Sequence, residues 1–283
     1  MPPASQTSMI AIFTDLDGTL IDFDNYSSEL ARPYVHRLIK LGYLVIFCSS
    51  KTFAEQRVLQ EEIDIEMPCI VENGSAIIAP PGFWNPEFVD FDVVDGWQRI
   101  VLGKPAAEIR QRLRRVECKF GESLHGFSSM MTEDIASVTG LDIGSARRAQ
   151  NREYSETLSA KLPQDVWESL DSAFEYEGLK CLPGGRFHTV IDSQSDKGAA
   201  IRKFGELWKA QSSEPLISFG LGDSENDQEL LENVDWPHLV KRPNGSWAGL
   251  SGRRIERVNG VGPKGWVKVA EQLLSKAKPE ATV

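Results

Sequence analysis

Apolar runs alternate with amphipathic helix patterns along the first 74 residues of the chain. The runs MIAIFTD (9–15), YLVIFCSS (43–50) and PCIVENG (68–74) are apolar at most positions, so each predicts a strand buried on both faces. Strands of this kind, joined by helices, are typical of a parallel sheet that helices cover on both sides. The alternation returns late in the chain, where PLISFGLGD (215–223) predicts another buried strand.

The sequence between about 80 and 187 has a different pattern. It opens with the Pro- and Gly-rich stretch APPGFWNPEF and continues with two helix patterns separated by irregular segments. We therefore predict an α/β fold class, with a Rossmann-like doubly wound parallel-sheet core and an inserted α+β domain. The predicted boundaries place residues 1–83 and 188–283 in the discontinuous core and residues 84–187 in the insertion.

Charge and cysteine content narrow the class of protein. The formal net charge is −10, whereas proteins that bind nucleic acid or anionic membranes over a broad surface are usually basic. No apolar run is long enough to cross a bilayer, and the N-terminal MPPASQTS lacks the basic and apolar regions of a secretory signal. We therefore expect a cytoplasmic protein with no nucleic-acid or membrane partner. Its four widely spaced cysteines favour free thiols. The sequence predicts no oligomeric state.

Polar residues stand where the predicted core strands end and the next helices begin. Asp15 and Asp17 follow the first strand, and Ser49 follows the second. Lys197 opens a later helix pattern, and GDSEND (222–227) follows the last buried strand. In an open parallel sheet, ligands bind outside the carboxyl ends of the strands, so we expect these residues to meet there.

These residue types suit the transfer of a phosphoryl group. A carboxylate can attack phosphorus and form an aspartyl-phosphate. A second carboxyl can protonate the leaving alcohol and then activate water. Because attack on an anionic phosphate needs charge neutralisation, a divalent cation held by carboxylates and a lysine ammonium would both contribute. A serine hydroxyl and backbone N–H groups at a helix start can hold the remaining phosphate oxygens.

The stretch DLDGTL, a serine after an apolar strand, a lysine on a later helix and GDSEND resemble, in this order, the motifs of the haloacid dehalogenase-like (HAD) phosphatases. The resemblance implies that Asp15 is the nucleophile and that Asp17 is the general acid and base. It also implies that Ser49 binds the transferring phosphoryl group and that Lys197 neutralises its charge.

The same resemblance implies a Mg²⁺ cofactor. Its ligands would be the side chains of Asp15 and Asp223 and the backbone carbonyl of Asp17. Asp227 either joins these ligands or fixes the loop that carries them. The insertion lies between the second and third motifs, as in family members whose α/β cap closes over the active site. It is therefore predicted to be a cap that determines substrate specificity.

Within this family, CSSKT, ENGSAI, REYSETL, GGRFHTV and GLGDSEND together resemble the mannosyl-3-phosphoglycerate phosphatases. This resemblance implies that the substrate is a small phosphorylated sugar or glycoside. The substrate that it favours is mannosyl-3-phosphoglycerate, and the product would be mannosylglycerate. Glucosyl-3-phosphoglycerate, sucrose phosphate and hexose phosphates are alternative substrates. A phosphomutase is an alternative activity, and a non-catalytic phosphosugar-binding protein is the alternative outside enzymes.

Residues beside the predicted catalytic loops and in the cap are candidates for binding the rest of the substrate. An arginine fork suits a carboxylate such as that of glycerate, and glycine lets a ligand approach the backbone. The alternative for the cap residues is an ordinary solvent-exposed surface. The candidates are Ser50, Asn73, Gly74, Arg152, Glu153, Gly184, Gly185, Arg186 and His188.

Overall fold

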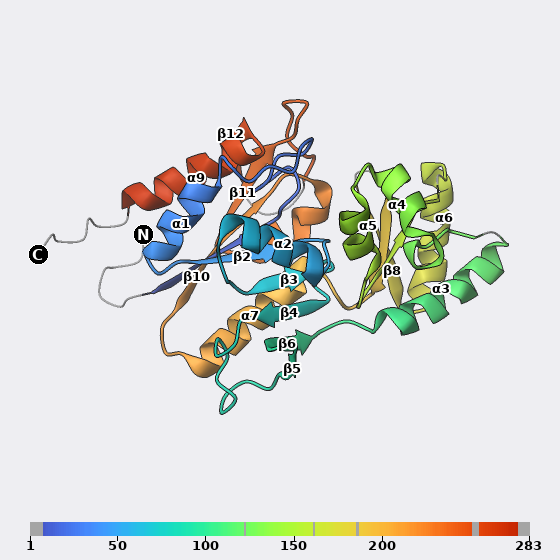
Figure 1. The fold of residues 1–283 in the computed structure, drawn as a ribbon, viewed down its shortest axis with the longest axis horizontal. Helices are drawn as coiled ribbons and strands as arrows, with labels where there is room; N and C mark the ends of the chain where they lie inside the picture. Colours follow the sequence, from blue (N-terminus) through green and yellow to red (C-terminus); the bar gives the residue numbers. More distant parts are fainter. Residues whose placement is uncertain (1–7, 122, 161, 185–186, 251–254, 277–283) are drawn as a thin grey trace, which may run out of the picture.

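A computed structural model describes the chain as two packed units, a large sheet flanked by helices and a smaller α+β domain beside it (Figure 1). The smaller domain is built from the middle of the chain. The described residues are 8–121, 123–160, 162–184, 187–250 and 255–276.

The larger sheet explains the alternation of apolar runs in the sequence. Its strands are β1 (Met9–Thr14), β2 (Leu44–Cys48), β3 (Cys69–Val71), β4 (Ala76–Ala79), β5 (Asp92–Val94), β6 (Trp97–Val101), β10 (Leu216–Gly222), β11 (Trp236–Lys241) and β12 (Glu256–Val261). In the described residues they lie in the order β12-β11-β10-β1-β2-β3-β4-β6-β5. Neighbours from β12 to β3 are parallel, whereas β4, β6 and β5 extend the sheet in antiparallel fashion. The predicted α/β class is therefore confirmed.

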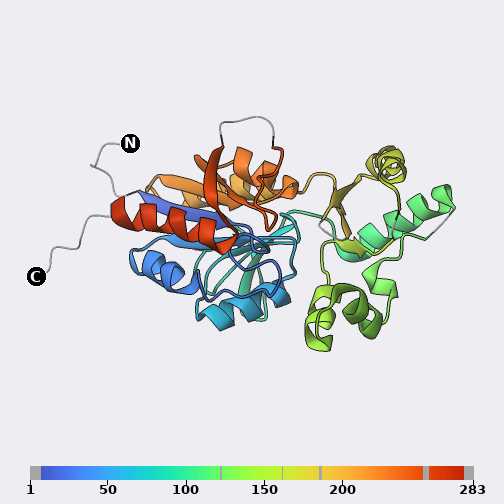
Figure 2. The same ribbon diagram turned by 90° about the horizontal axis from the view of Figure 1, so that it is seen from above.

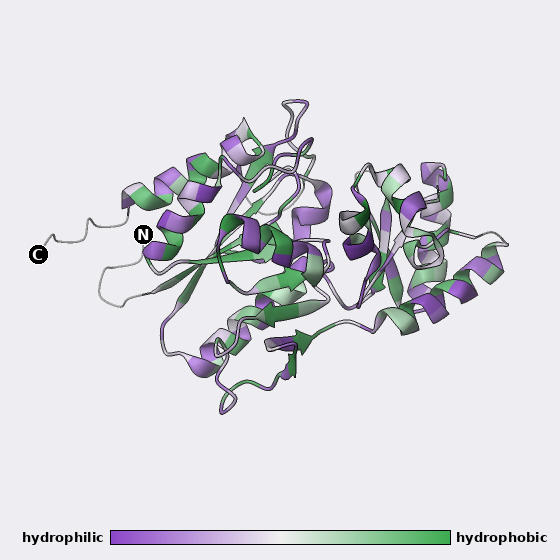
Figure 3. Ribbon diagram, viewed as in Figure 1, coloured by the Kyte–Doolittle hydropathy of each residue, from purple (hydrophilic) through white to green (hydrophobic). Residues whose placement is uncertain are grey.

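Helices cover both faces of this sheet (Figures 1 and 2). They are α1 (Arg32–Lys40), α2 (Phe53–Ile63) and α9 (Pro263–Lys276) on one face, and α7 (Lys197–Gln211) and α8 (Gln228–Glu232) on the other. Ile12 packs in the first apolar cluster and its neighbour Phe13 in the second, because successive strand residues point to opposite faces. Figure 3 shows the resulting hydrophobic centre. Within the described ranges, each helix is too short or too polar to cross a membrane.

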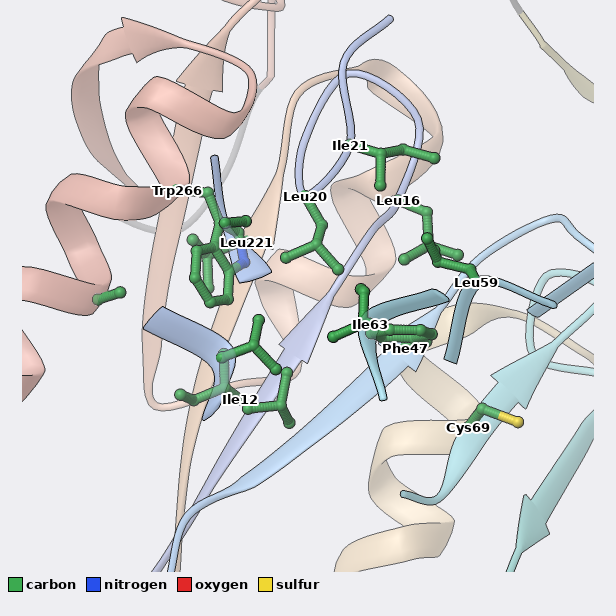
Figure 4. Packing of buried hydrophobic residues seen from close by; sticks show 14 of the residues in the cluster. Ile12, Leu16, Leu20, Ile21, Phe47, Leu59, Ile63, Cys69, Leu221 and Trp266 are labelled. Carbon is green, nitrogen blue, oxygen red and sulfur yellow. The ribbon is translucent and has the colours of Figure 1, made fainter. Parts of the chain in front are cut away.

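Apolar packing anchors the loop that follows β1. Leu16, Leu20 and Ile21 are buried in the same cluster as Ile12 and Trp266 (Figure 4). The acids of the DLDGTL motif are interleaved with these residues in the sequence. Burial of the apolar side chains therefore fixes the loop, so that its polar side chains can be held at the edge of the sheet.

The inserted domain has its own sheet and its own apolar core. The small sheet consists, in the described residues, of three antiparallel strands. Their order is β7 (Glu156–Leu158), β9 (His188–Asp192) and β8 (Leu179–Pro183). Leu113, Phe174 and Val190 belong to the cluster that joins this sheet to two long helices. The helices of the domain are α3 (Ala106–Phe120), α4 (Thr132–Thr139), α5 (Ile143–Gln150) and α6 (Gln164–Tyr176), with the short 3₁₀ turn η1 (Phe127–Ser129).

Strand pairing moves both predicted domain boundaries. The segment 84–101 was expected in the insertion, but β6 pairs with β4 of the large sheet, with Ala76 opposite Val101. At the other end, 188–192 was expected in the core, but this segment is the middle strand of the small sheet. The chain thus leaves the large sheet after β6 and returns to it after β9. An apolar run indicates a strand, and it does not indicate which of two sheets the strand will join.

Candidate active site

The turn that carries Asp15 and Asp17 lies directly against the loop that follows β10. The N–H of Asp15 donates to the carbonyl of Leu221 at 2.9 Å, which extends the parallel β1–β10 pairing by one residue. Gly18 has a φ of +78°, and a Cβ there would lie 2.9 Å from Oδ2 of Asp223. A glycine is therefore needed for the two loops to approach this closely.

Lys197 enters the same region from the start of α7. Its Nζ lies 2.7 Å from Oδ1 of Asp15 and 2.6 Å from Oδ1 of Asp227, and its side chain is 2% exposed. Burial lowers the pKa of Lys197, and the two carboxylates raise it. Their effect is larger than that of burial, so the pKa of Lys197 lies above its usual value. Asp196 caps the helix by accepting the N–H of Ala199 at 2.6 Å, which fixes where Lys197 begins the helix.

Asp227 holds the loop after β10 as well as the lysine. Its Oδ2 accepts the N–H of Asp223 at 3.0 Å and that of Ser224 at 3.2 Å. Ser224 and Asp227 form a capping box at the start of the next helix. The helix there begins as a 3₁₀ turn, η2 (Glu225–Asp227), and continues as α8. The sequence left two roles open for Asp227, as a metal ligand or as a residue that fixes the loop. The contacts needed for the second role are present.

Three carboxyl groups form a candidate metal centre. Within the described residues, Asp15, Asp223 and Asp227 are buried and offer oxygens that all lie within 4.8 Å of one another. Burial and the charge of Asp227 raise the pKa of Asp15 well above its usual value, and the same causes raise the pKa of Asp223 to about 7. Lys197 offsets this repulsion only in part. Because hard divalent cations prefer carboxylate oxygens, this donor set fits an ion such as Mg²⁺.

The carboxylate of Asp17 lies outside this group of three. Its Oδ2 is 2.9 Å from Nζ of Lys51, and its Oδ1 is buried with no hydrogen-bond partner in the part of the chain described. The resemblance implied that Asp17 contacts the metal through its backbone carbonyl. Its side chain has a different partner, Lys51. Lys51 was not among the residues singled out in the sequence, although it directly follows the two predicted phosphate-loop serines.

Ser49 stands at the same edge of the sheet as Asp15. Thr14 lies opposite Phe47 in the parallel β1–β2 pair, so both loops leave the sheet side by side. Ser49 is 1% exposed, and its Oγ accepts the N–H of Lys51 at 3.3 Å. Helix α2 begins just beyond, with a capping box between its N-cap threonine and Glu55. A hydroxyl and a helix N-terminus together suit an anionic ligand.

A strained turn after β3 contacts both the loop that carries Ser49 and the start of α7. Glu72, Asn73 and Gly74 all have positive φ, at 48°, 58° and 91°. The N–H of Asn73 donates to the carbonyl of Ser49 at 3.0 Å. A Cβ on Gly74 would lie 2.0 Å from the carbonyl oxygen of Asp196, the cap of the helix that carries the site lysine. This turn therefore packs the serine loop against the start of α7.

Replacement of Gly74 by Ala is expected to destabilise the fold by roughly 2–5 kcal/mol, because it combines left-handed backbone strain with a clash against a backbone carbonyl. Urea unfolding would measure the change. Gly82 is the matched control, since it has a φ of +77° but nothing within 4 Å of a built Cβ. Gly82→Ala should cost only about 1–2 kcal/mol, the usual penalty for a side chain in the left-handed region. Equal losses in the two variants would show that the close approach of Gly74 contributes nothing.

Glu72 joins this turn to the inserted domain. Its Oε1 accepts the N–H of Glu153 at 2.9 Å, and its Oε2 accepts the N–H of Tyr154 at 3.1 Å and the hydroxyl of Ser155. The Glu72 side chain is 1% exposed. Burial raises the pKa of Glu72, and the nearby Arg152 and these donors compensate only in part. The only signal for Glu72 in the sequence was its position in the ENGSAI stretch. That position did not distinguish a residue that binds the inserted domain from an ordinary turn residue.

Arg152 is a predicted cap residue that contacts the loop after β2. Its Nη1 donates to the carbonyl of Ser50 at 3.1 Å and to Oγ of Ser155 at 2.8 Å. Its Nε is buried with no partner among the described residues. Ser50 thus meets the inserted domain through its backbone. These contacts place an arginine beside the loop that carries Ser49, where the substrate was expected.

Other predicted cap residues are engaged elsewhere. Glu153 forms an ion pair with Arg99 of β6 at 2.9 Å, so it joins the two domains. The ring of His188 stacks on Trp167 with centroids 3.8 Å apart, on the side of the small sheet that packs against α6, and burial lowers its pKa. The N–H of Gly184 donates to the carbonyl of Phe187 at 2.8 Å. Gly185 and Arg186 lie outside the described residues.

Relatives from other organisms match most of the chain. A glucosyl-3-phosphoglycerate/mannosyl-3-phosphoglycerate phosphatase from Methanococcoides burtonii is 36% identical over 266 residues, which cover 94% of this chain and 97% of the relative. A mannosyl-3-phosphoglycerate phosphatase from Pyrococcus horikoshii is 36% identical over 229 residues, which cover 81% of this chain and 89% of the relative.

A family model and the solved structures agree with these relatives. The model described as haloacid dehalogenase-like hydrolase matches residues 12–83, which include Asp15, Asp17 and Ser49. A phosphatase of the haloalkanoate (HAD) enzyme superfamily from Bacteroides thetaiotaomicron has the same fold, with a TM-score of 0.65 and 14% identity over 97% of this chain and 98% of its own. Fold, identity and coverage together show that the chain belongs to the phosphatases of the haloacid dehalogenase-like hydrolase family.

Proposed function

We propose that this phosphatase removes the phosphate from mannosyl-3-phosphoglycerate and releases mannosylglycerate. The observation that carries the proposal is the buried group of Asp15, Lys197 and the carboxylates after β10, which combines a nucleophile with the means to neutralise a phosphate. The names of the two relatives support the substrate. Glucosyl-3-phosphoglycerate, named for the M. burtonii relative, is the alternative.

In the first step of the proposed mechanism, the carboxylate of Asp15 attacks phosphorus in line with the ester oxygen. The P–O ester bond breaks, and Asp17 donates a proton to the departing glycerate oxygen. Lys197 is held against Oδ1 of Asp15 at 2.7 Å, so its positive charge lies where the negative charge of the phosphoryl group arrives. Ser49 donates its hydroxyl to one of the phosphoryl oxygens.

In the second step, Asp17 takes a proton from water, and the water oxygen attacks the phosphorus of the aspartyl-phosphate. The bond to Asp15 breaks, which releases inorganic phosphate and restores the carboxylate. One residue thus serves first as acid and then as base. The carboxylate of Asp17 is separate from the group of Asp15, Asp223 and Asp227, and in this structure it contacts Lys51.

Mg²⁺ is the proposed cofactor, held by the carboxylates of Asp15 and Asp223 and by the backbone carbonyl of Asp17. When bound, it supplies positive charge that neutralises the phosphoryl oxygens. In this proposal Asp227 is a positioning residue. Its oxygens already accept hydrogen bonds from Lys197 and from two backbone N–H groups, so it holds the lysine and the loop in place.

The inserted domain is proposed to act as the cap that selects the leaving group and excludes water. In support, Arg152 contacts Ser50, and Thr52 Oγ1 donates to the carbonyl of Arg148 at 3.1 Å. Residues of the insertion therefore lie directly on the loop that follows β2. The glycerate and sugar of the substrate would be enclosed between this loop and the insertion.

A phosphate-release assay on a panel of substrates tests the function. The panel contains mannosyl-3-phosphoglycerate, glucosyl-3-phosphoglycerate, sucrose 6-phosphate and hexose phosphates, each with Mg²⁺ and with a chelator. We expect the highest kcat/KM for mannosyl-3-phosphoglycerate and no turnover under chelation. Equal rates across the panel would overturn the narrow substrate, and isomerised sugar phosphate in place of released phosphate would identify a mutase. Absence of any turnover would favour a non-catalytic binding protein.

A further inference from the structure

Lys51 is a second cation at the site, and its surroundings differ from those of Lys197. Its Nζ is 2.9 Å from Oδ2 of Asp17 and lies over the ring of Tyr26, 5.2 Å from the centroid. The side chains of Lys51 and Asp17 are 19% and 34% exposed, whereas that of Lys197 is 2% exposed. Lys197 is thus enclosed by carboxylates, while Lys51 and Asp17 keep part of their side chains exposed to solvent.

The position of Lys51 relates it to the leaving group rather than to the phosphoryl group. In the proposed mechanism Asp17 meets the ester oxygen, and Lys51 is bound to the outer oxygen of the same carboxylate. Its backbone N–H is fixed on Ser49 Oγ at 3.3 Å, and its carbonyl accepts the N–H of Glu72 at 3.0 Å. The ammonium is therefore held from a fixed backbone against Oδ2 of Asp17, the residue that protonates the ester oxygen in the proposed mechanism.

We propose that Lys51 binds a carboxylate carried by the leaving alcohol, and that this exchange of partners frees Oδ2 of Asp17 to face the ester oxygen. The inference rests on the proposed glycosyl-3-phosphoglycerate substrate. In 3-phosphoglycerate the carboxylate and the phosphate ester lie at opposite ends of the same short carbon chain. A cation one hydrogen bond away from the acid is therefore well placed for this carboxylate. Lys51 thus becomes a specificity-determining residue of the core.

A matched pair of substrates tests this role. The first is mannosyl-3-phosphoglycerate, and the second is the same molecule with its carboxylate reduced to a primary alcohol. In the wild type we expect kcat/KM to favour the carboxylate by about 100-fold, the size of effect that follows loss of one partner of a charge pair. In Lys51→Met we expect kcat/KM for the carboxylate substrate to fall by about 100-fold. For the alcohol analogue it should stay the same or rise, since Asp17 is then released from the lysine.

Two further variants separate specificity from structure. Lys51→Arg should retain part of the preference, because a guanidinium also binds carboxylate. Lys203→Met should leave both substrates unchanged, because Lys203 pairs with Glu206 on the surface of α7 at 3.4 Å. Equal losses on both substrates in Lys51→Met would overturn the inference, since Lys51 would then act only by holding Asp17. A wild type that does not distinguish the two substrates would also overturn it.

A binding experiment keeps this inference separate from the identity of the sugar. If neither glycosyl ester is hydrolysed, the proposed function fails, and Lys51 is tested with 3-phosphoglycerate and glycerol 3-phosphate. By calorimetry, the Asp15→Asn variant should bind 3-phosphoglycerate about 10-fold more tightly than glycerol 3-phosphate. The double variant Asp15→Asn, Lys51→Met should bind the two ligands with equal affinity. Equal affinities in Asp15→Asn would overturn the role of Lys51 whatever the sugar.

Discussion

The Asp15→Asn variant is expected to lose at least about 10⁴-fold in kcat on every phosphomonoester that the wild type hydrolyses, because an amide cannot form the covalent intermediate. We expect its melting temperature not to fall. Burial and the charge of Asp227 raise the pKa of Asp15, so removal of the Asp15 charge relieves repulsion. Phosphate release and calorimetric melting measure the two effects, and together they distinguish a missing nucleophile from a damaged fold.

Asp22→Asn provides the matched control for this variant. Asp22 lies in the same loop, and its Oδ1 accepts N–H groups from Asp24 and Asn25 at 3.0 and 3.2 Å, which an amide oxygen can also do. The sequence assigned it no catalytic role. We expect kcat within about 2-fold of the wild type, as for a surface substitution that keeps its contacts. Metal-dependent turnover in Asp15→Asn would contradict the assignment of the nucleophile.

Replacement of Lys197 by Met is expected to lower both activity and stability. The substitution leaves Asp15 and Asp227 buried without their shared cation, which should cost about 3–5 kcal/mol of unfolding free energy in the presence of a chelator. Loss of the charge that faces the phosphoryl group should lower kcat by at least about 10³-fold. Urea unfolding and phosphate release are the measurements.

The pH dependence gives this prediction a second test. Asp15 has a raised pKa even beside Lys197, so without the lysine it can take up a proton more readily as the pH falls. The stability deficit of Lys197→Met should therefore be largest above neutral pH and shrink toward pH 5. Lys203→Met on the same helix should show no deficit at any pH, because its partner Glu206 is exposed. A pH-independent deficit would mean that lost packing, rather than lost charge, destabilises the variant.

The arrangement of the core could be predicted from local pattern. Apolar runs separated by helix patterns indicated a parallel sheet, and in such a sheet the residues after each strand share one edge. The structure places Asp15 beside the β10 loop and brings Lys197 to it across 182 positions of sequence. The sequence did not need to specify these long contacts pair by pair, because the topology brings the strand ends together.

The partners of individual polar side chains could not be predicted in the same way. Glu72 and Lys51 follow strands just as Ser49 does, and only the fold shows that one receives the backbone of the insertion while the other contacts Asp17. Glu153 was expected at the substrate and instead pairs with Arg99. A charged residue in a sequence has many possible partners, and the choice depends on which domain surfaces are packed together.

The order of strands in the large sheet has a consequence for how the chain is made. β1 and β10 are direct neighbours, with Met9 opposite Leu216, yet the whole insertion is synthesised between them. During translation, one edge of β1 stays unpaired until β10 has emerged, while the insertion can already fold on its own apolar core. Asp223 and Asp227 arrive last, so the proposed catalytic group is assembled only at the end. A nascent chain that stalls before β10 would expose an apolar strand edge, which is prone to aggregate.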